Sequence, residues 1–181
     1  MSRLLALAVV LLVGLAPALA RTITEAEAEG IAARVDSFDA AMTARDFDTI
    51  IGVIPPPVLA HIAEQANVPA EELVTALAAQ MGEIFADVDL ISFGMDLAAA
   101  EHHELGDGEP YLLIPTTTVM EADGLGRMKV ESFTLGMLDE GAWYLVRTSD
   151  AAMVGILRQV YPQFTGVTFP AETITALEDR P

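Results

Sequence analysis

The densest strand-like pattern in the chain lies between residues 110 and 148, where β-branched and aromatic residues gather between short turns. Three segments carry this pattern: 111–121, 127–138 and 142–148. The turns between them contain Asp123-Gly124 and Glu140-Gly141, and such pairs at this spacing are typical of β-hairpins. The pattern therefore predicts three consecutive strands of an antiparallel meander.

The amino-terminal half shows helical periodicity instead. Thr24 and Glu27 have the spacing of a capping box, and apolar residues then recur every three or four positions as far as Met42. Asp46 is placed to cap a second, short helix. The prolines at 55–57 end that helix and begin a third one.

A longer helix is predicted from about Pro69 to Asp87, because Asn67, an early proline and two glutamates form a start signal. Its apolar residues recur at helical spacing, which predicts one buried stripe. The residues of this stripe are Leu73, Leu77, Met81, Ile84 and Phe85.

Residues 88–96 are expected to start the sheet, and residues 98–105 to add an edge strand. A short helix follows the meander, capped by Ser149 or Asp150 and ended by Pro162. Helices and strands are thus segregated along the chain. This order predicts an α+β fold, with amino-terminal helices packed on a curved, cone-like antiparallel meander and a short carboxyl-terminal helix.

The two predicted hairpins also fix which side chains share a face of the sheet, because side chains alternate along a strand. One face holds Thr116, Ser132, Thr134 and Arg147 among apolar residues. The other face holds Tyr111, Leu113, Phe133, Leu135, Met137, Tyr144 and Val146. Both faces are largely apolar, so one should meet the helices, and the other either the carboxyl-terminal tail or a second copy of the chain.

Residues 1–20 have the pattern of a cleavable signal peptide. Arg3 precedes the apolar run 4–15, and Ala18-Leu19-Ala20 fits a cleavage site after Ala20. An uncleaved anchor is the alternative, but the run is short of the roughly 20 residues that span a membrane. We therefore expect a periplasmic or secreted protein whose residues 21–181 form one domain, with no membrane contact in the mature form.

The charge and cysteine content narrow the possible partners. The 181 residues include 27 acidic and 9 basic ones, for a formal net charge of −18. Nucleic acid and anionic lipid surfaces would repel such a chain. The absence of cysteine excludes disulfides, thiolate metal sites and a cysteine nucleophile.

The succession of elements resembles the nuclear transport factor two-like superfamily of α+β cones. The resemblance covers residues 23–170 and rests on the long capped first helix, the short helix at Arg45-Asp46-Phe47-Asp48, a third helical layer, and a meander ending in Trp143-Tyr144-Leu145-Val146. It implies a pocket inside a helix-lined cone and often a dimer formed through the sheet. Its members include ketosteroid isomerases, SnoaL-like polyketide cyclases, scytalone dehydratase and domains that only bind or scaffold.

The polar residues Thr116, Ser132 and Thr134, with Arg147, are the sharpest candidates for a ligand site. A fixed guanidinium among hydroxyls suits a carboxylate or another polar ligand group. The competing interpretation is a partly exposed sheet centre, or an ion pair of Arg147 with Glu131 or Asp150.

Two tyrosines and three ionisable residues complete the candidates. Tyr111 and Tyr144 either donate hydrogen bonds into a cavity or are core aromatics with hydroxyls at the rim. His61, Glu83 and Asp87 are weak candidates for acid–base chemistry, and each is otherwise a structural or solvated helix residue.

No metal site or other cofactor is predicted. Adjacent residues on a strand point to opposite sides, so His102 and His103 cannot readily bind one ion.

Taken together, these features lead us to expect an exported, non-catalytic binding domain for a small apolar or amphipathic molecule or for a protein partner. The alternatives are a cofactor-independent isomerase, dehydratase or cyclase that uses an acidic residue or His61, and a structural homodimer domain.

Overall fold

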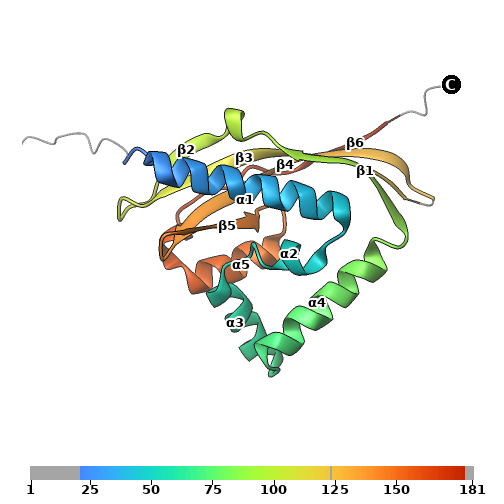
Figure 1. Ribbon diagram of the computed structural model, residues 1–181, viewed down its shortest axis with the longest axis horizontal. Coiled ribbons are helices and arrows are strands. Elements are labelled where there is room, and N and C mark those ends of the chain that lie inside the picture. The colour runs from blue at the N-terminus through green and yellow to red at the C-terminus, as the bar shows by residue number, and fades with distance from the viewer. Residues whose placement is uncertain (1–20, 123, 178–181) are drawn as a thin grey trace, which may run out of the picture.

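The computed structural model describes residues 21–122 and 124–177, in which four helices precede a curled antiparallel sheet (Figure 1). The helices are α1 (Glu25–Ala44), α2 (Phe47–Ile51), α3 (Pro56–Ala66), α4 (Ala70–Ile84) and, after the sheet, α5 (Ala151–Val160). The strands are β1 (Val88–Met95), β2 (Glu101–Glu104), β3 (Pro110–Ala122), β4 (Gly126–Asp139), β5 (Ala142–Arg147) and β6 (Thr173–Ala176). The predicted α+β class is confirmed. The predicted leader and its cleavage site lie outside the described residues.

The first helices begin and end where the local chemistry places them. The backbone N–H of Thr24 donates to Glu27 Oε2 at 2.7 Å and the Glu27 N–H donates to Thr24 Oγ1 at 3.2 Å, so the predicted capping box forms. Asp46 caps α2 through the Thr49 N–H. Asn67 does not cap α4. It adopts a left-handed φ of 55° and ends α3, and α4 follows Pro69.

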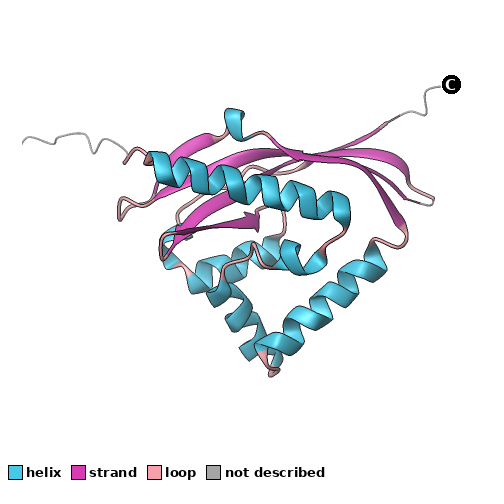
Figure 2. Ribbon diagram, viewed as in Figure 1, coloured by secondary structure: helices cyan, strands magenta, loops and turns pink. Residues whose placement is uncertain are grey.

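The sheet is built around the long β3–β4 hairpin, and each of these two strands pairs with two further strands besides its hairpin partner (Figure 2). At one end β2 pairs with β3 and β5 with β4; at the other end β1 pairs with β3 and β6 with β4. The register pairs Met120 with Met128 and Thr134 with Arg147, as the hairpins predicted. Only Glu101–Glu104 of the expected edge segment forms a strand, because Leu97–Ala99 makes a 3-10 turn.

One face of the sheet packs against α1. This core contains Ile31 and Val35 of α1 and, from the sheet, Leu112, Ile114, Trp143 and Leu145. Gly136 allows the close approach, because a Cβ there would lie 3.3 Å from Ile31 Cδ1 and 3.4 Å from Ile114 Cδ1. The helix therefore lies directly on the strands.

The opposite face is covered by the carboxyl-terminal part of the same chain. Its core contains Leu113, Leu135, Met137 and Val146 from the sheet, and Leu157 of α5 and Phe164 beyond it. Of the two covers that the sequence left open for this face, the tail is the one observed. A sheet-mediated dimer stays a prediction.

The predicted buried stripe of α4 is confirmed at Leu73 and only in part beyond it, since Leu77, Met81 and Phe85 are half-buried. Leu73 is the only buried residue of this helix, and Ile84 is 56% exposed. The helix packs against α2 and α3, and it runs out from α3 toward β1 without lying on the sheet (Figure 1). The apolar residues of its last turns face a cavity instead. No helix in the described part of the chain is long and apolar enough to cross a membrane.

Candidate functional site

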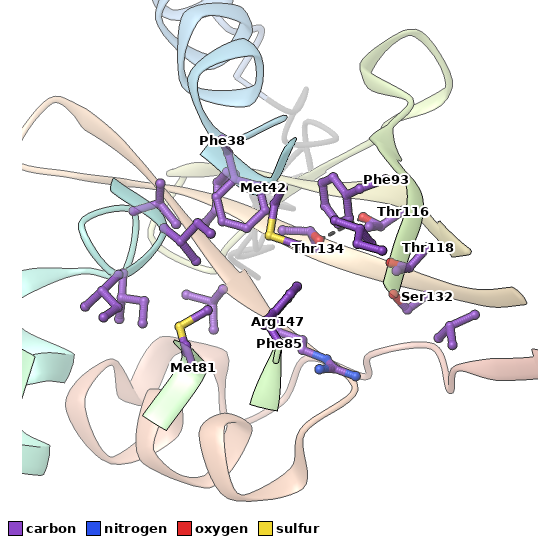
Figure 3. Close-up of a pocket in the computed structure, with 18 of the residues that line it drawn as sticks. Phe38, Met42, Met81, Phe85, Phe93, Thr116, Thr118, Ser132, Thr134 and Arg147 are labelled. Carbon is purple, nitrogen blue, oxygen red and sulfur yellow. Dashed lines mark hydrogen bonds between the residues drawn. The ribbon is translucent and has the colours of Figure 1, made fainter. Parts of the chain in front are cut away.

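A cavity of about 490 Å³ lies between α1, α2, α4 and the face of the sheet that carries Thr116 and Thr134 (Figure 3). Its volume falls within the range of small-molecule sites, roughly 300–1,000 Å³. Twenty-two described residues line it, and all but five are apolar. The cavity exists because α1 packs directly on the end of this sheet face that carries Leu112 and Trp143. Helix α4 stands away from the other end, which carries Thr116 and Thr118.

The apolar walls come from elements far apart in the sequence. Figure 3 shows Phe38 and Met42 of α1, Met81 of α4, Phe85 just after it, and Phe93 of β1 around one space. The rings of Phe38 and Phe93 lie 5.5 Å apart at a tilt of 59°. Such contacts hold the wall residues in place.

Four hydroxyls form a polar strip along the sheet side of the cavity: Thr116 and Thr118 on β3, and Ser132 and Thr134 on β4. Antiparallel pairing puts them together, since Thr116 lies opposite Ser132. Thr116 Oγ1 donates to the Ile114 carbonyl at 3.0 Å and lies 2.8 Å from Thr134 Oγ1. Since a hydroxyl has one hydrogen, Thr134 is the donor of that second bond. The lone pairs of Thr134 remain to accept a bond from a ligand.

Arg147 lines the cavity at its open side, with 68% of its side chain exposed. Its Nε donates to Ser149 Oγ at 2.7 Å, and its Nη2 lies 3.3 Å from Glu172 Oε2. The acidic partner is thus Glu172, just before β6, and not Glu131 or Asp150. Thr116, Ser132, Thr134 and Arg147, grouped by the predicted register, do line one cavity.

The two tyrosine candidates lie on the other face of the sheet and are not among the lining residues. Tyr111 is 7% exposed, stacks on His103 at 5.0 Å and meets Phe164 edge-on at 5.7 Å. Burial raises the pKa of its hydroxyl. Tyr144 is half-buried with the Arg34 guanidinium 5.7 Å from its ring centre. Both are placed as the core-aromatic interpretation expects.

None of the three acid–base candidates lines the cavity. His61 Nε2 lies 2.9 Å from Gln159 Oε1 and 2.8 Å from Gln65 Nε2, so its ring links α3 to α5. Glu83 and Asp87 are exposed near the end of α4. The structure therefore does not bring these groups to one place.

The histidine pair also forms no metal site in the described residues. His103 Nε2 lies 3.2 Å from Glu101 Oε2, and His102 is exposed. No group of three or more His, Asp or Glu side chains is placed to hold an ion in residues 21–122 and 124–177.

Sequence reasoning missed the helical walls and the partner of Arg147. Met81, Ile84 and Phe85 have the spacing of core residues, and that spacing cannot distinguish a packed core from a cavity wall. Glu172 lies 25 residues after Arg147, in a tail without a clear period. No local pattern signals such a contact.

Comparison with protein-family models, with curated proteins and with solved structures finds no match to this chain. The fold class is nevertheless settled: helices are followed by a strongly curled antiparallel sheet and a short carboxyl-terminal helix. That architecture is compatible with a cone-like fold. The chemistry of the cavity therefore has to be judged from its own residues.

Proposed function

We propose that this chain is an exported binding domain of the nuclear transport factor two-like kind, which holds a small apolar or amphipathic molecule between its helices and its sheet. The observation that carries the proposal is the cavity of about 490 Å³, with apolar walls and one strip of hydroxyls. The order of helices and the curled meander support the family. The leader pattern at residues 1–20 supports export.

Apolar walls favour a ligand because water in the cavity finds few hydrogen-bond partners there. Moving apolar ligand surface out of water contributes about 25 cal/mol per Å². The hydroxyls of Thr118, Ser132 and Thr134 would orient the ligand rather than supply most of the affinity. This division between apolar walls and a few polar groups is what small-molecule sites require.

The lining offers little to the alternative of an acid–base enzyme. A general acid or base must come within about 2.6–3.2 Å of the proton that it moves. Arg147 is the only ionisable side chain among the described lining residues, and a guanidinium keeps its proton. None of the candidates His61, Glu83 and Asp87 is among the lining residues, so none of them would contact a ligand in the cavity. Binding without chemistry is therefore the better-supported function.

The homodimer alternative loses its main support as well. It rested on an apolar sheet face without a cover, and α5 and Phe164 cover that face. A small molecule in the cavity needs no partner chain.

The test is a titration of the protein with N-phenyl-1-naphthylamine, a neutral dye that fluoresces in apolar sites. We expect saturable binding that Thr118→Phe weakens at least severalfold, because the added ring would take up part of the cavity and remove one of its hydroxyls. The matched control is Thr117→Phe, the same change on the preceding residue of β3, whose side chain points to the other face of the sheet. It should bind the dye as the unmodified protein does.

Circular dichroism and urea unfolding would show that both variants fold. No saturable binding by the unmodified protein, or equal loss in both folded variants, would contradict the proposal.

A further inference from the structure

The charges around the cavity run against those of the whole chain. Acidic residues outnumber basic ones by 27 to 9, yet no Asp or Glu is among the described lining residues. The single charge in the lining is the guanidinium of Arg147. A cation at the opening of an apolar cavity, in so acidic a chain, matches a ligand whose one polar end is negative.

The guanidinium is oriented but not fully used. The Nε bond to Ser149 Oγ fixes its plane, and the Nη2 contact with Glu172 occupies one more donor. A guanidinium has five N–H donors, so three remain. With Glu172 moved aside, the four donors on the two Nη atoms can receive a planar anion in the forked arrangement that carboxylates prefer.

The ion pair with Glu172 is of the kind that exchanges easily. It is a single contact of 3.3 Å between side chains that are 68% and 31% exposed. Exposed pairs of this kind contribute about 0–1 kcal/mol. The backbone next to Glu172 is held independently, since β6 pairs with β4. Only the Glu172 side chain would have to move for another anion to take its place.

A polar path leads from Arg147 into the cavity. Arg147 lies directly opposite Thr134 across β4 and β5, and Thr134 bonds to Thr116. Across the cavity from the strands, the helices present only apolar side chains such as Phe38 and Met42 (Figure 3). A ligand with an anionic head and one long apolar chain fits both sides.

Resting on the function proposed above, we infer that the ligand is a long-chain carboxylate or a close anionic relative. Its head binds Arg147 by displacing Glu172, and its chain lies along the apolar walls. Glu172 is then a built-in competitor that lowers the affinity for the ligand. The Arg147–Glu172 pair affects only how the anionic head binds at the opening, and the apolar walls are the same with or without it.

The test measures displacement of bound N-phenyl-1-naphthylamine by dodecanoate, dodecanol and dodecyltrimethylammonium, below micelle-forming concentrations and at fixed salt. Dodecanoate should bind about tenfold more tightly than dodecanol, because its head gains a charge-assisted hydrogen bond. It should do so although a net charge of −18 repels it. The cationic amphiphile should bind most weakly.

Variants of the two charged residues separate the roles. Arg147→Gln should bring the affinity for dodecanoate down to that for dodecanol, and Glu172→Gln should raise the affinity for dodecanoate about twofold to fivefold. Both variants should change dodecanol binding much less than dodecanoate binding, because the dodecanol head carries no charge. The matched controls are Arg127→Gln and Glu121→Gln, which break a similar exposed pair of 3.1 Å on the same sheet, outside the cavity lining.

The outcomes distinguish the inference from the function beneath it. Equal binding of dodecanoate and dodecanol by the unmodified protein, or a preference that survives in Arg147→Gln, overturns the anionic ligand. No gain in Glu172→Gln relative to Glu121→Gln overturns the competition. In each case dye binding would still support the apolar site, whereas failure to bind the dye at all would remove the proposed function itself.

Discussion

At the scale of single residues, Asp39 is one of two described residues with a buried side-chain polar atom that has no hydrogen-bond partner. It lies on α1 beside the cavity residue Phe38, and its Oδ1 is buried without a hydrogen-bond partner. Burial raises the pKa of its carboxyl group, a hydrogen bond from the backbone of Met95 offsets part of this rise, and the negative charge of Asp36 adds to it. Asp39 therefore destabilises the fold when it is ionised.

The pH dependence of stability should reveal this cost. The folded protein holds the Asp39 proton more tightly than the unfolded chain, so stability falls as pH rises from the usual aspartate pKa, about 4, through the raised one. Asp39→Asn should increase the free energy of unfolding at pH 7 by less than about 1 kcal/mol, because solvent screens part of the effect, with the gain shrinking toward pH 4. Urea unfolding at both pH values measures it.

Glu29→Gln is the control, because it removes an exposed carboxylate from the same helix. It should leave stability nearly unchanged at both pH values. An Asn variant that is less stable than the unmodified protein at pH 7 would show that the Asp39 carboxylate makes a favourable contact in solution.

At the scale of elements, the carboxyl-terminal segment is held to α5 by Arg158. Its Nη2 donates to the Val167 carbonyl at 2.7 Å and its Nε to the Phe164 carbonyl at 3.3 Å. The guanidinium also lies 5.8 Å from the ring centre of Phe169. These contacts keep Phe164, which is fully buried, against the second face of the sheet.

Loss of this contact should loosen the cover of the second face. Arg158→Gln should lower the free energy of unfolding by about 2 kcal/mol, since charge-assisted hydrogen bonds to two carbonyls are lost. The control Arg127→Gln removes an exposed ion pair and should cost less than about 1 kcal/mol. Urea unfolding followed by Trp143 fluorescence compares them, and equal losses would mean that Arg158 does not hold the segment.

At the scale of the whole molecule, one curled sheet serves two purposes. The end formed by β5 and the adjoining parts of β3 and β4 is packed between α1 and the carboxyl-terminal elements. The end that adjoins β1 faces the cavity. Because α4 packs on α2 and α3 and fully buries only Leu73, it is held less firmly than the strands at the centre of the sheet. The helix beside the opening is thus the least anchored wall of the site.

Hydrogen exchange should show this difference. Amides in the last turns of α4 should exchange much faster than those at the centre of β3 and β4, and N-phenyl-1-naphthylamine should slow them by burying Met81, Ile84 and Phe85. Amides of α3, which do not border the cavity, serve as the internal control. Protection of α4 equal to that of β4 without the dye would contradict this picture.

The local rules of the chain determined most of its elements, the register of the two hairpins and the grouping of its polar residues, but not the strand β6 in the tail. Asp46 and the pair Thr24 and Glu27 begin helices through bonds to residues three positions away, so the sequence is enough to place them. The turn with φ 48° at Glu140 and 80° at Gly141 fixes the β4–β5 register. Alternation then puts Thr134 and Arg147 on one face, so the sequence alone is enough to group them.

Only the tertiary structure decided where the chain is packed and where it is open. An apolar stripe such as that of α4 has the same sequence pattern whether it packs in a core or lines a cavity. The spacing of Leu73 and Met81 says which side of the helix is apolar, but not how far that side lies from another element. The cover of the second sheet face and the pairing of Arg147 with Glu172 likewise depend on how a tail of irregular sequence folds back. These contacts join residues far apart in the chain, so no local periodicity encodes them.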